Sequence, residues 1–186
     1  MKTTLNISRL ISSGSAAALC LGFLALQTAS GADTGNRGQF TASDYKFVTE
    51  AIQGGRMEVT LGQMAAKNAA NLEVRKFGER MVQDHEKANT ELADLIAKKG
   101  ATLPEPSVKK EERMVDHLKS LTGPDFDRAY VKEMLSDHKK DVKEFQKQAE
   151  KADDAELKSW VSKTLPTLQE HLSIVQGLEQ KVVATR

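Results

Sequence analysis

Hydrophobic and small residues recur along most of the chain at alternating steps of three and four positions. This spacing places side chains on one face of an α-helix. The four successive stripes are Phe47, Ala51, Gly54, Glu58, Leu61 and Ala65; Val74, Gly78, Met81, His85, Ala88, Leu92 and Leu95; Val131, Met134, His138, Val142, Phe145 and Ala149; and Leu157, Val161, Thr164, Leu168, His171, Val175 and Leu178. No segment sustains the period-two alternation of a strand, so the pattern predicts an all-α protein.

Capping residues set the limits of the first two helices. Thr41 or Ser43 is suited to the N-cap of a helix over about 44–69. Asn71 is suited to the N-cap of the next helix, and Gly100 can take the left-handed conformation that ends it. Because the link between the two helices is short, they are expected to form a hairpin.

The second pair of helices forms another expected hairpin, reached by a longer connection. That connection contains two prolines and a short charged helix over 107–121. Pro124 suits the first turn of a helix over about 125–151, and the Asp153 and Glu156 spacing is a capping-box variant that opens the last helix. Two hairpins joined by one long connection predict a ferritin-like four-helix bundle.

Residues ahead of the helices have the zones of a secretory signal peptide in their usual order. Lys2 and Arg9 provide the basic zone, and 16–26 is an apolar run too short to span a bilayer. Small residues then allow cleavage after Ser30 or Ala32. We therefore expect an exported protein, periplasmic or extracellular, with association with the outer membrane left open.

The predicted organisation is a leader over 1–32, a flexible arm over 33–43 and a bundle domain over 44–182. Loss of the leader would reduce the Lys and Arg total by two from 27, against 26 acidic residues. The near-neutral mature chain lacks the concentrated basic face that nucleic-acid binding requires. Cys20, the only cysteine, would leave with the leader, which excludes disulfides and thiol chemistry. No transmembrane segment is expected in the mature chain.

Each of the four stripes contains one ionisable residue at a core position: Glu58, His85, His138 and His171. Burying such a group is costly unless it is paired, hydrogen-bonded or bound to a metal. Counting from the hairpin turns places Glu58 and His85 at the same height in the bundle. His171 is expected to be offset from His138 by three residues, or about 4.5 Å.

Two interpretations of this layer remain open. In one, up to three imidazoles and the Glu58 carboxylate bind Zn, Fe or Mn. Asp84 and Asp137 point about 100° away from the histidines that follow them, and would contact a histidine of a neighbouring helix in the outer shell. In the other, the layer is hydrogen-bonded and holds no metal. His117 also follows an aspartate, but in the short charged helix, and is expected on the surface.

Several sequence features resemble an exported bacterial domain family of unknown function, often labelled an outer membrane protein. The resemblance extends from about Phe47 to Leu178 and implies a secreted, ferritin-like four-helix module with no settled activity. Its marks are the pairs Asp84-His85 and Asp137-His138, "FDRAY" at 126–130 and "LPTLQEHL" at 165–172.

The ligand pattern differs from that of di-iron ferritin-like enzymes, which use Glu-x-x-His on two helices. The residues three positions before the layer histidines are Val82, Leu135 and Leu168, and only Glu58 supplies an inward carboxylate. No catalytic residue is predicted, and an enzyme is not favoured. The sequence favours an envelope binding or structural module, with an envelope partner or a homo-oligomer left open. A periplasmic metal-binding protein with a storage, scavenging or redox role is the alternative.

Overall fold

Helices account for most of the described chain, in the order that the hydrophobic pattern predicts. The computed structural model describes residues 35–104 and 108–184, so the predicted leader over 1–32 and both predicted cleavage positions lie outside the described residues. The helices are α1 (Ala42–Asn68), α2 (Leu72–Lys98), α3 (Val108–Lys119), α4 (Gly123–Lys151) and α5 (Ala155–Ala184). These ranges contain no strand, which confirms the all-α prediction.

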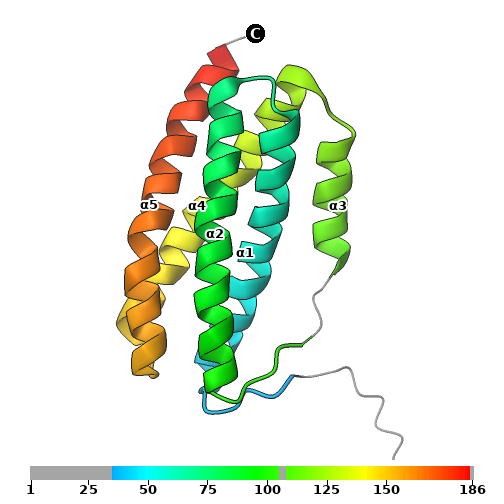
Figure 1. Cartoon of the computed structure of the whole chain (residues 1–186). Helices are drawn as coiled ribbons and strands as arrows, with labels where there is room; N and C mark the ends of the chain where they lie inside the picture. The colour runs from blue at the N-terminus through cyan, green and yellow to red at the C-terminus, as the bar shows by residue number, and fades with distance from the viewer. Residues whose placement is uncertain (1–34, 105–107, 185–186) are drawn as a thin grey trace, which may run out of the picture. The chain divides into compact units, whose positions relative to one another are not determined.

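The long helices form two hairpins, α1 with α2 and α4 with α5 (Figure 1). Between the hairpins, α2 packs against α5, while α1 packs more loosely against α4. The connection carries α3, which lies outside the four long helices (Figure 1). This arrangement confirms the predicted ferritin-like bundle. Within the described ranges, no helix has an apolar stretch long enough to cross a membrane.

Local capping explains where the helices begin and end. The side chains of Thr41 and Asn71 accept hydrogen bonds from backbone N–H groups in the first turns of α1 and α2. Gly100, just after α2, has a φ of 66°, which glycine adopts without steric cost. The predicted cap of α5 at Asp153 is wrong by one residue. Asp154 accepts the capping hydrogen bonds, at 3.0 and 2.9 Å.

The segment before α1 is attached to the segment that follows α2. The chain was expected to form a flexible arm over 33–43, but α1 already begins at Ala42. Asn36 and Thr102 exchange two hydrogen bonds, of 2.8 and 2.6 Å. Phe40 is 3% exposed and packs in the core. Burial of this aromatic ring explains why the described part of the segment is attached to the bundle.

Two buried aspartates connect each hairpin to the turn of the other. Asp44, near the start of α1, accepts hydrogen bonds from the Gln148 side chain at 2.6 Å and from the Asp154 backbone at 3.0 Å. Asp127, near the start of α4, accepts from the backbone N–H groups of Ala70 and Asn71 at 3.0 and 2.7 Å. Both ends of the bundle are therefore held by a carboxylate that satisfies backbone donors at a turn.

The core is divided into two apolar clusters along the bundle axis. The first includes Leu61, Val74, Phe77, Phe126, Tyr130 and Val175. The second includes Val48, Ile52, Leu92, Phe145, Leu157 and Val161. On each long helix, the ionisable residue of the stripe lies between the two clusters. One position of the first stripe was wrong: Gly54 is exposed, and its neighbour Gly55 is buried instead.

Glycines allow α1 and α2 to approach each other closely. A Cβ atom added at Gly78 would lie 2.7 Å from the Ala65 Cβ atom and 2.7 Å from the Gly62 carbonyl oxygen. A Cβ atom added at Gly62 would lie 2.9 Å from the Gly78 oxygen. Backbone therefore packs on backbone at this crossing, where no larger residue fits without movement.

Replacing Gly78 with alanine is expected to lower the free energy of unfolding by about 1–3 kcal/mol, because the two helices must separate to admit the methyl group. Gly177 is the matched control, since a Cβ atom there has no neighbour within 4 Å. Gly177→Ala should raise stability slightly, by about 0.5–1 kcal/mol, through helix propensity alone. Denaturant titration measures both variants. Equal stability of Gly78→Ala and the parent chain would disprove the close contact.

Candidate metal centre

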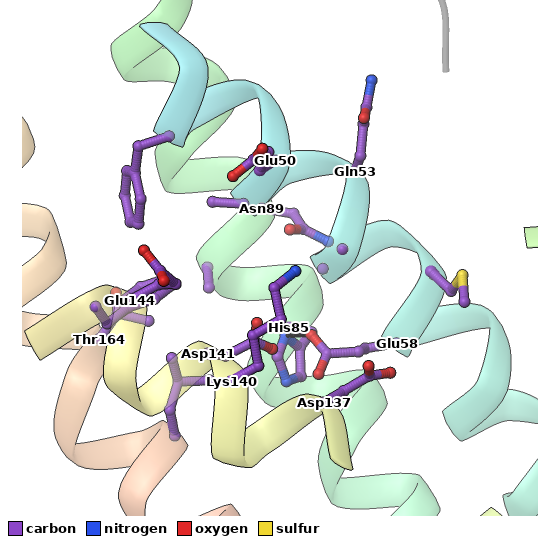
Figure 2. A pocket seen from close by; sticks show the side chains of 18 of the residues that line it. Glu50, Gln53, Glu58, His85, Asn89, Asp137, Lys140, Asp141, Glu144 and Thr164 are labelled. Carbon is purple, nitrogen blue, oxygen red and sulfur yellow. Dashed lines mark ion pairs between the residues drawn. The ribbon is translucent and has the colours of Figure 1, made fainter. Parts of the chain in front are cut away.

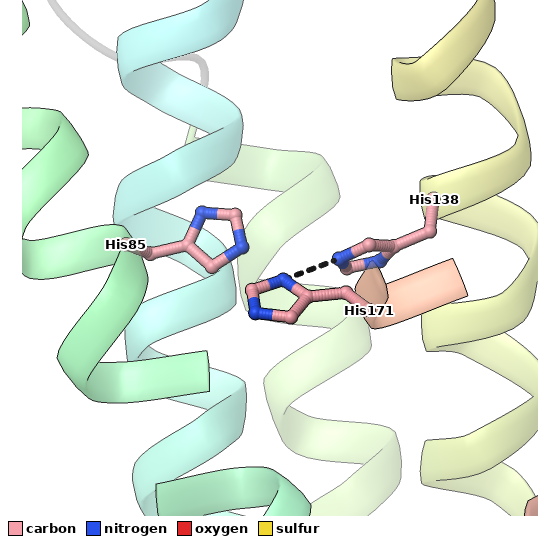
Figure 3. A group of neighbouring side chains, drawn as sticks. All are labelled: His85, His138 and His171. Carbon is pink, nitrogen blue, oxygen red and sulfur yellow. Dashed lines mark hydrogen bonds between the residues drawn. The ribbon is translucent and has the colours of Figure 1, made fainter. Parts of the chain in front are cut away.

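The ionisable residues of the four stripes meet in one buried layer. Glu58, His85, His138 and His171 come from α1, α2, α4 and α5, and their exposed fractions are 4%, 6%, 0% and 0%. The three histidines each offer one nitrogen, and these nitrogens lie within 4.8 Å of one another (Figure 3). Packed apolar clusters lie on both sides of the layer, and the protonation of each ring decides what the layer can bind.

The Nδ1 atom of His138 lies 3.0 Å from the backbone oxygen of Met134. A carbonyl oxygen only accepts, so Nδ1 must carry the proton. Burial, helped by the neighbouring His171, lowers the pKa of His138 to about 4, so the ring is neutral at neutral pH. In a neutral ring with a protonated Nδ1, the Nε2 atom has an unshared electron pair.

The ring nitrogen of His171 that does not face His138 is held by Asp84. Its Nε2 atom lies 2.8 Å from a carboxylate oxygen of Asp84. Partial burial acts to raise the pKa of Asp84, but hydrogen bonds from His171 and Arg80 hold it below the usual value. The carboxylate is therefore ionised and accepts a hydrogen bond from the Nε2–H group of His171. Burial also lowers the pKa of His171, so the neutral ring presents a bare Nδ1.

His85 is held through its contact with Glu58, whose Oε2 atom is 3.1 Å from His85 Nδ1. When Glu58 is ionised, the proton of the neutral ring is favoured on Nδ1, which faces the carboxylate, and Nε2 is left bare. Burial, then the two nearby histidines, lower the pKa of His85 to about 3. Its Nε2 atom is buried and has no hydrogen-bond partner among the described residues. The ring of His85 points toward the other two rings (Figure 3).

With Glu58 ionised, three unshared electron pairs therefore face one another. His138 Nε2 and His171 Nδ1 are 3.4 Å apart, along the dashed line in Figure 3. With both rings neutral and anchored as described, neither atom has a proton to donate to the other. Adjacent electron pairs repel unless a cation lies near them, and three neutral imidazole nitrogens are common ligands of Zn, Cu and Fe.

Glu58 lies on the side of the histidine rings that is turned away from the facing nitrogens. Besides its contact with His85, its Oε1 atom is 3.5 Å from His138 Nδ1, so both contacts are with the Nδ1 atoms and not with the facing electron pairs. Burial, then the charges of Asp141 and Asp137, raise the pKa of Glu58 well above its usual value. The structure brings Glu58 next to His85, as their distances from the turn predicted, and next to His138 as well.

His171 was expected to be offset from His138 by about 4.5 Å along the bundle. His138 Nε2 and His171 Nδ1 nevertheless lie only 3.4 Å apart. Asp137 lies near Glu58, and its role as a partner of a histidine stays a prediction. His117 is exposed, as expected.

Two further features were missed because they depend on residues far apart in the sequence. Arg80 holds Asp84 at 3.2 Å and also donates to Glu170 at 2.7 Å; the four-residue spacing of Arg80 and Asp84 was the available signal. A cavity of about 340 Å³ also ends at Glu58 and His85 (Figure 2). Its walls come from all four long helices, so no single stripe marks it.

The metal-free protein is expected to lose stability as the pH falls from about 6.5 toward 4. An unfolded histidine titrates near 6.5, whereas His85 and His138 titrate near 3 and 4 in the fold. The unfolded chain therefore binds more protons in this window, so the stabilisation is complete above about 6.5 and declines below it. Glu58, with its raised pKa, makes stability fall as the pH rises above about 4.5. It is one group, whereas two histidines act in the stated sense.

Denaturant titration at several pH values, with a chelator present, measures this dependence. His85→Leu should reduce the slope of unfolding free energy against pH between about 6.5 and 4. His117→Leu, at an exposed position, should leave the slope unchanged. An unchanged slope in His85→Leu would contradict the expectation.

Comparisons with known proteins agree with this fold. No curated protein sequence matches the chain. A crystal structure of a DUF305 fragment from Deinococcus radiodurans is similar, with a TM-score of 0.67 and 15% identity, over 76% of this chain and 98% of that one. CopM in the Cu(II)-bound form is also similar, with a TM-score of 0.64 and 15% identity, over 74% of this chain and 96% of that one. At such identity the likeness shows the fold.

A family model covers most of the chain. The model of a domain of unknown function, DUF4142, matches residues 29–178. The matched range includes all four long stripes and every residue of the buried layer. The chain belongs to the DUF4142 family.

Proposed function

We propose that this protein binds one transition-metal ion through His85 Nε2, His138 Nε2 and His171 Nδ1. The observation that carries this proposal is the 3.4 Å contact between His138 and His171, whose other nitrogens are anchored by acceptors. A layer built for hydrogen bonding alone would place a donor opposite an acceptor at this contact. A bound cation would instead use both electron pairs and that of the unpartnered His85 Nε2.

In this proposal Glu58 and Asp84 orient the rings from outside. Each carboxylate accepts from the ring nitrogen that does not face the ion, which fixes the tautomer and increases the basicity of the other nitrogen. The negative charge of Glu58 also offsets the charge of a buried cation. Glu58 was expected as a ligand; its contacts with the Nδ1 atoms of His85 and His138 support the orienting role instead.

Three imidazoles are suited to Zn, Cu or Fe more than to Mn, which favours oxygen ligands. Cu(II) is included because the structurally similar CopM is described in a Cu(II)-bound form. We infer a role in metal binding, such as storage or scavenging, in preference to catalysis, since the layer supplies one inward carboxylate. The leader predicted over 1–32 supports export, and the periplasm as the place of action.

The test is titration of chelator-treated protein with Zn(II), Cu(II), Fe(II) and Mn(II), followed by calorimetry and thermal unfolding. We expect one ion per chain for at least one metal, with a clear rise in melting temperature, because binding to the folded state alone stabilises it. If no metal binds stoichiometrically and no melting temperature changes, the layer has only a structural role. That result would favour the envelope structural module over metal binding.

A further inference from the structure

The cavity that ends at the buried layer has an aromatic wall. It occupies about 340 Å³ and receives side chains from α1, α2, α4 and α5. Phe47, Phe145 and Trp160 line it. The Phe145 ring lies 5.1 Å from Phe47 and 5.6 Å from Trp160, measured between ring centroids. These three rings form a continuous apolar surface that fits the body of an organic molecule.

Acidic side chains surround the same cavity. Glu50 on α1 and Asp137, Asp141 and Glu144 on α4 line it, whereas Lys140 is the one lysine in its lining (Figure 2). The side chains of Glu50 and Glu144 are 60% and 43% exposed, and each also pairs with a lysine of its own helix, Lys46 and Lys147, so five carboxylates outnumber the lysines around the cavity. The local field therefore favours a positively charged occupant.

Besides Nε2 of His85, two buried polar atoms of the lining residues have no hydrogen-bond partner within the described chain. One is Oε1 of Glu58, an acceptor, and the other is Nε1 of Trp160, a donor. The two residues are only 4% and 9% exposed. An unpaired buried polar atom is costly, and these two lie at a cavity with room for a partner. They are independent of the acidic rim and point to a ligand.

We propose that this cavity binds a small organic cation, namely a protonated or quaternary amine attached to an apolar body. The aromatic rings would contact both the apolar body and the cationic group, since aromatic faces attract cations. The carboxylates would supply the charge complement. A metal ion bound by the carboxylates alone would leave the apolar surface of the aromatic wall uncovered, so the lining favours an organic occupant.

This site goes beyond the proposed metal function and does not require a bound ion. It shares Glu58 and His85 with the metal centre, because both residues form the inner end of the cavity. An organic cation bound there would lie next to Glu58 and His85. The experiment is therefore done on chelator-treated protein, so that failure of metal binding and failure of amine binding give separate results.

Trp160 is the only tryptophan in the chain, so its fluorescence reports binding directly, with calorimetry as a second readout. Three probes of similar shape are compared: phenethylamine, 2-phenylethanol and 3-phenylpropionate. We expect saturable binding of the amine, binding of the alcohol weaker by about tenfold or more, and no binding of the carboxylate, since the charge term alone separates them. Equal binding of the three probes, or no binding of the amine by either readout, would overturn the proposal.

A glycine offers a way to block the cavity. Gly54 lines it, and a Cβ atom at this position meets no other atom within 4 Å. Gly54→Leu should abolish amine binding and leave the fold intact. Gly177→Leu is the matched control, because Gly177 is also helical with a free Cβ position but lies outside this cavity. It should bind the amine as the parent chain does.

The charge of the rim is tested separately with Glu144→Gln, which keeps the shape of the side chain. This variant should weaken amine binding about two- to fivefold, the range of a partly exposed charge pair, and should leave binding of the alcohol unchanged. Undiminished amine binding in Gly54→Leu would place the ligand elsewhere and overturn the assignment. An equal loss of amine and alcohol binding in Glu144→Gln would overturn the role of charge.

Discussion

Replacing His138 with leucine is expected to lower the affinity of the chain for its metal ion by more than about a hundredfold. Loss of a residue that only orients a ligand costs about 10–100-fold, and His138 is proposed to donate an electron pair itself. It is fully buried, so water has no easy access to replace it. Competition with a chelator of known affinity at pH 7 measures the change.

The control for this variant is His117→Leu, which removes an exposed histidine of α3 and should leave metal affinity unchanged. The thermal transition of metal-free His138→Leu shows whether the variant folds before its metal affinity is compared. The rise in melting temperature on adding metal should be absent from it. An unaltered affinity in His138→Leu would show that the ion, if bound, does not use the facing nitrogens.

Asp127→Ala is expected to reduce the free energy of unfolding by about 3 kcal/mol. The Asp127 carboxylate is 3% exposed and accepts hydrogen bonds from two backbone N–H groups at the turn between α1 and α2. Hydrogen bonds to a charged group contribute about 1.5–3 kcal/mol each, and the two donors would be left without their partner. Denaturant titration of the parent and variant chains measures the loss.

Asp125, one half-turn earlier, provides the matched control. Its side chain is 71% exposed and pairs with Arg128 on the surface, so Asp125→Ala should change stability by less than about 0.5 kcal/mol. If the two alanine variants lose equal stability, the effect belongs to the helix terminus in general. The specific connection between α4 and the turn would then be disproved.

The helical bundle and its buried layer could be predicted because both are encoded in local spacing. A helix repeats every 3.6 residues, so a histidine in register with Met81 and Leu92 must share their buried face. The same reasoning placed Glu58 near His85 from their distances to one turn. Neither inference needs the partner helix to be known.

The chemistry within the layer depends on contacts that spacing does not reveal. The tautomer of His171 follows from Asp84, which is 87 positions away in the chain. The connections made by Asp44 and Asp127 join residues 56 to 110 positions apart. The cavity depends on the looser packing of α1 against α4. Its acidic rim resembles any solvated helix face in the sequence.

The position of the histidines also affects how the fold would come apart. One ligand lies on α2 in the first hairpin, and the other two lie on α4 and α5 in the second. The chain has a single cysteine, so it cannot form an internal disulfide. An ion held as proposed would be a reversible cross-link between the hairpins. Separation of the two hairpins would then require the ion to dissociate, and a chelator would accelerate unfolding.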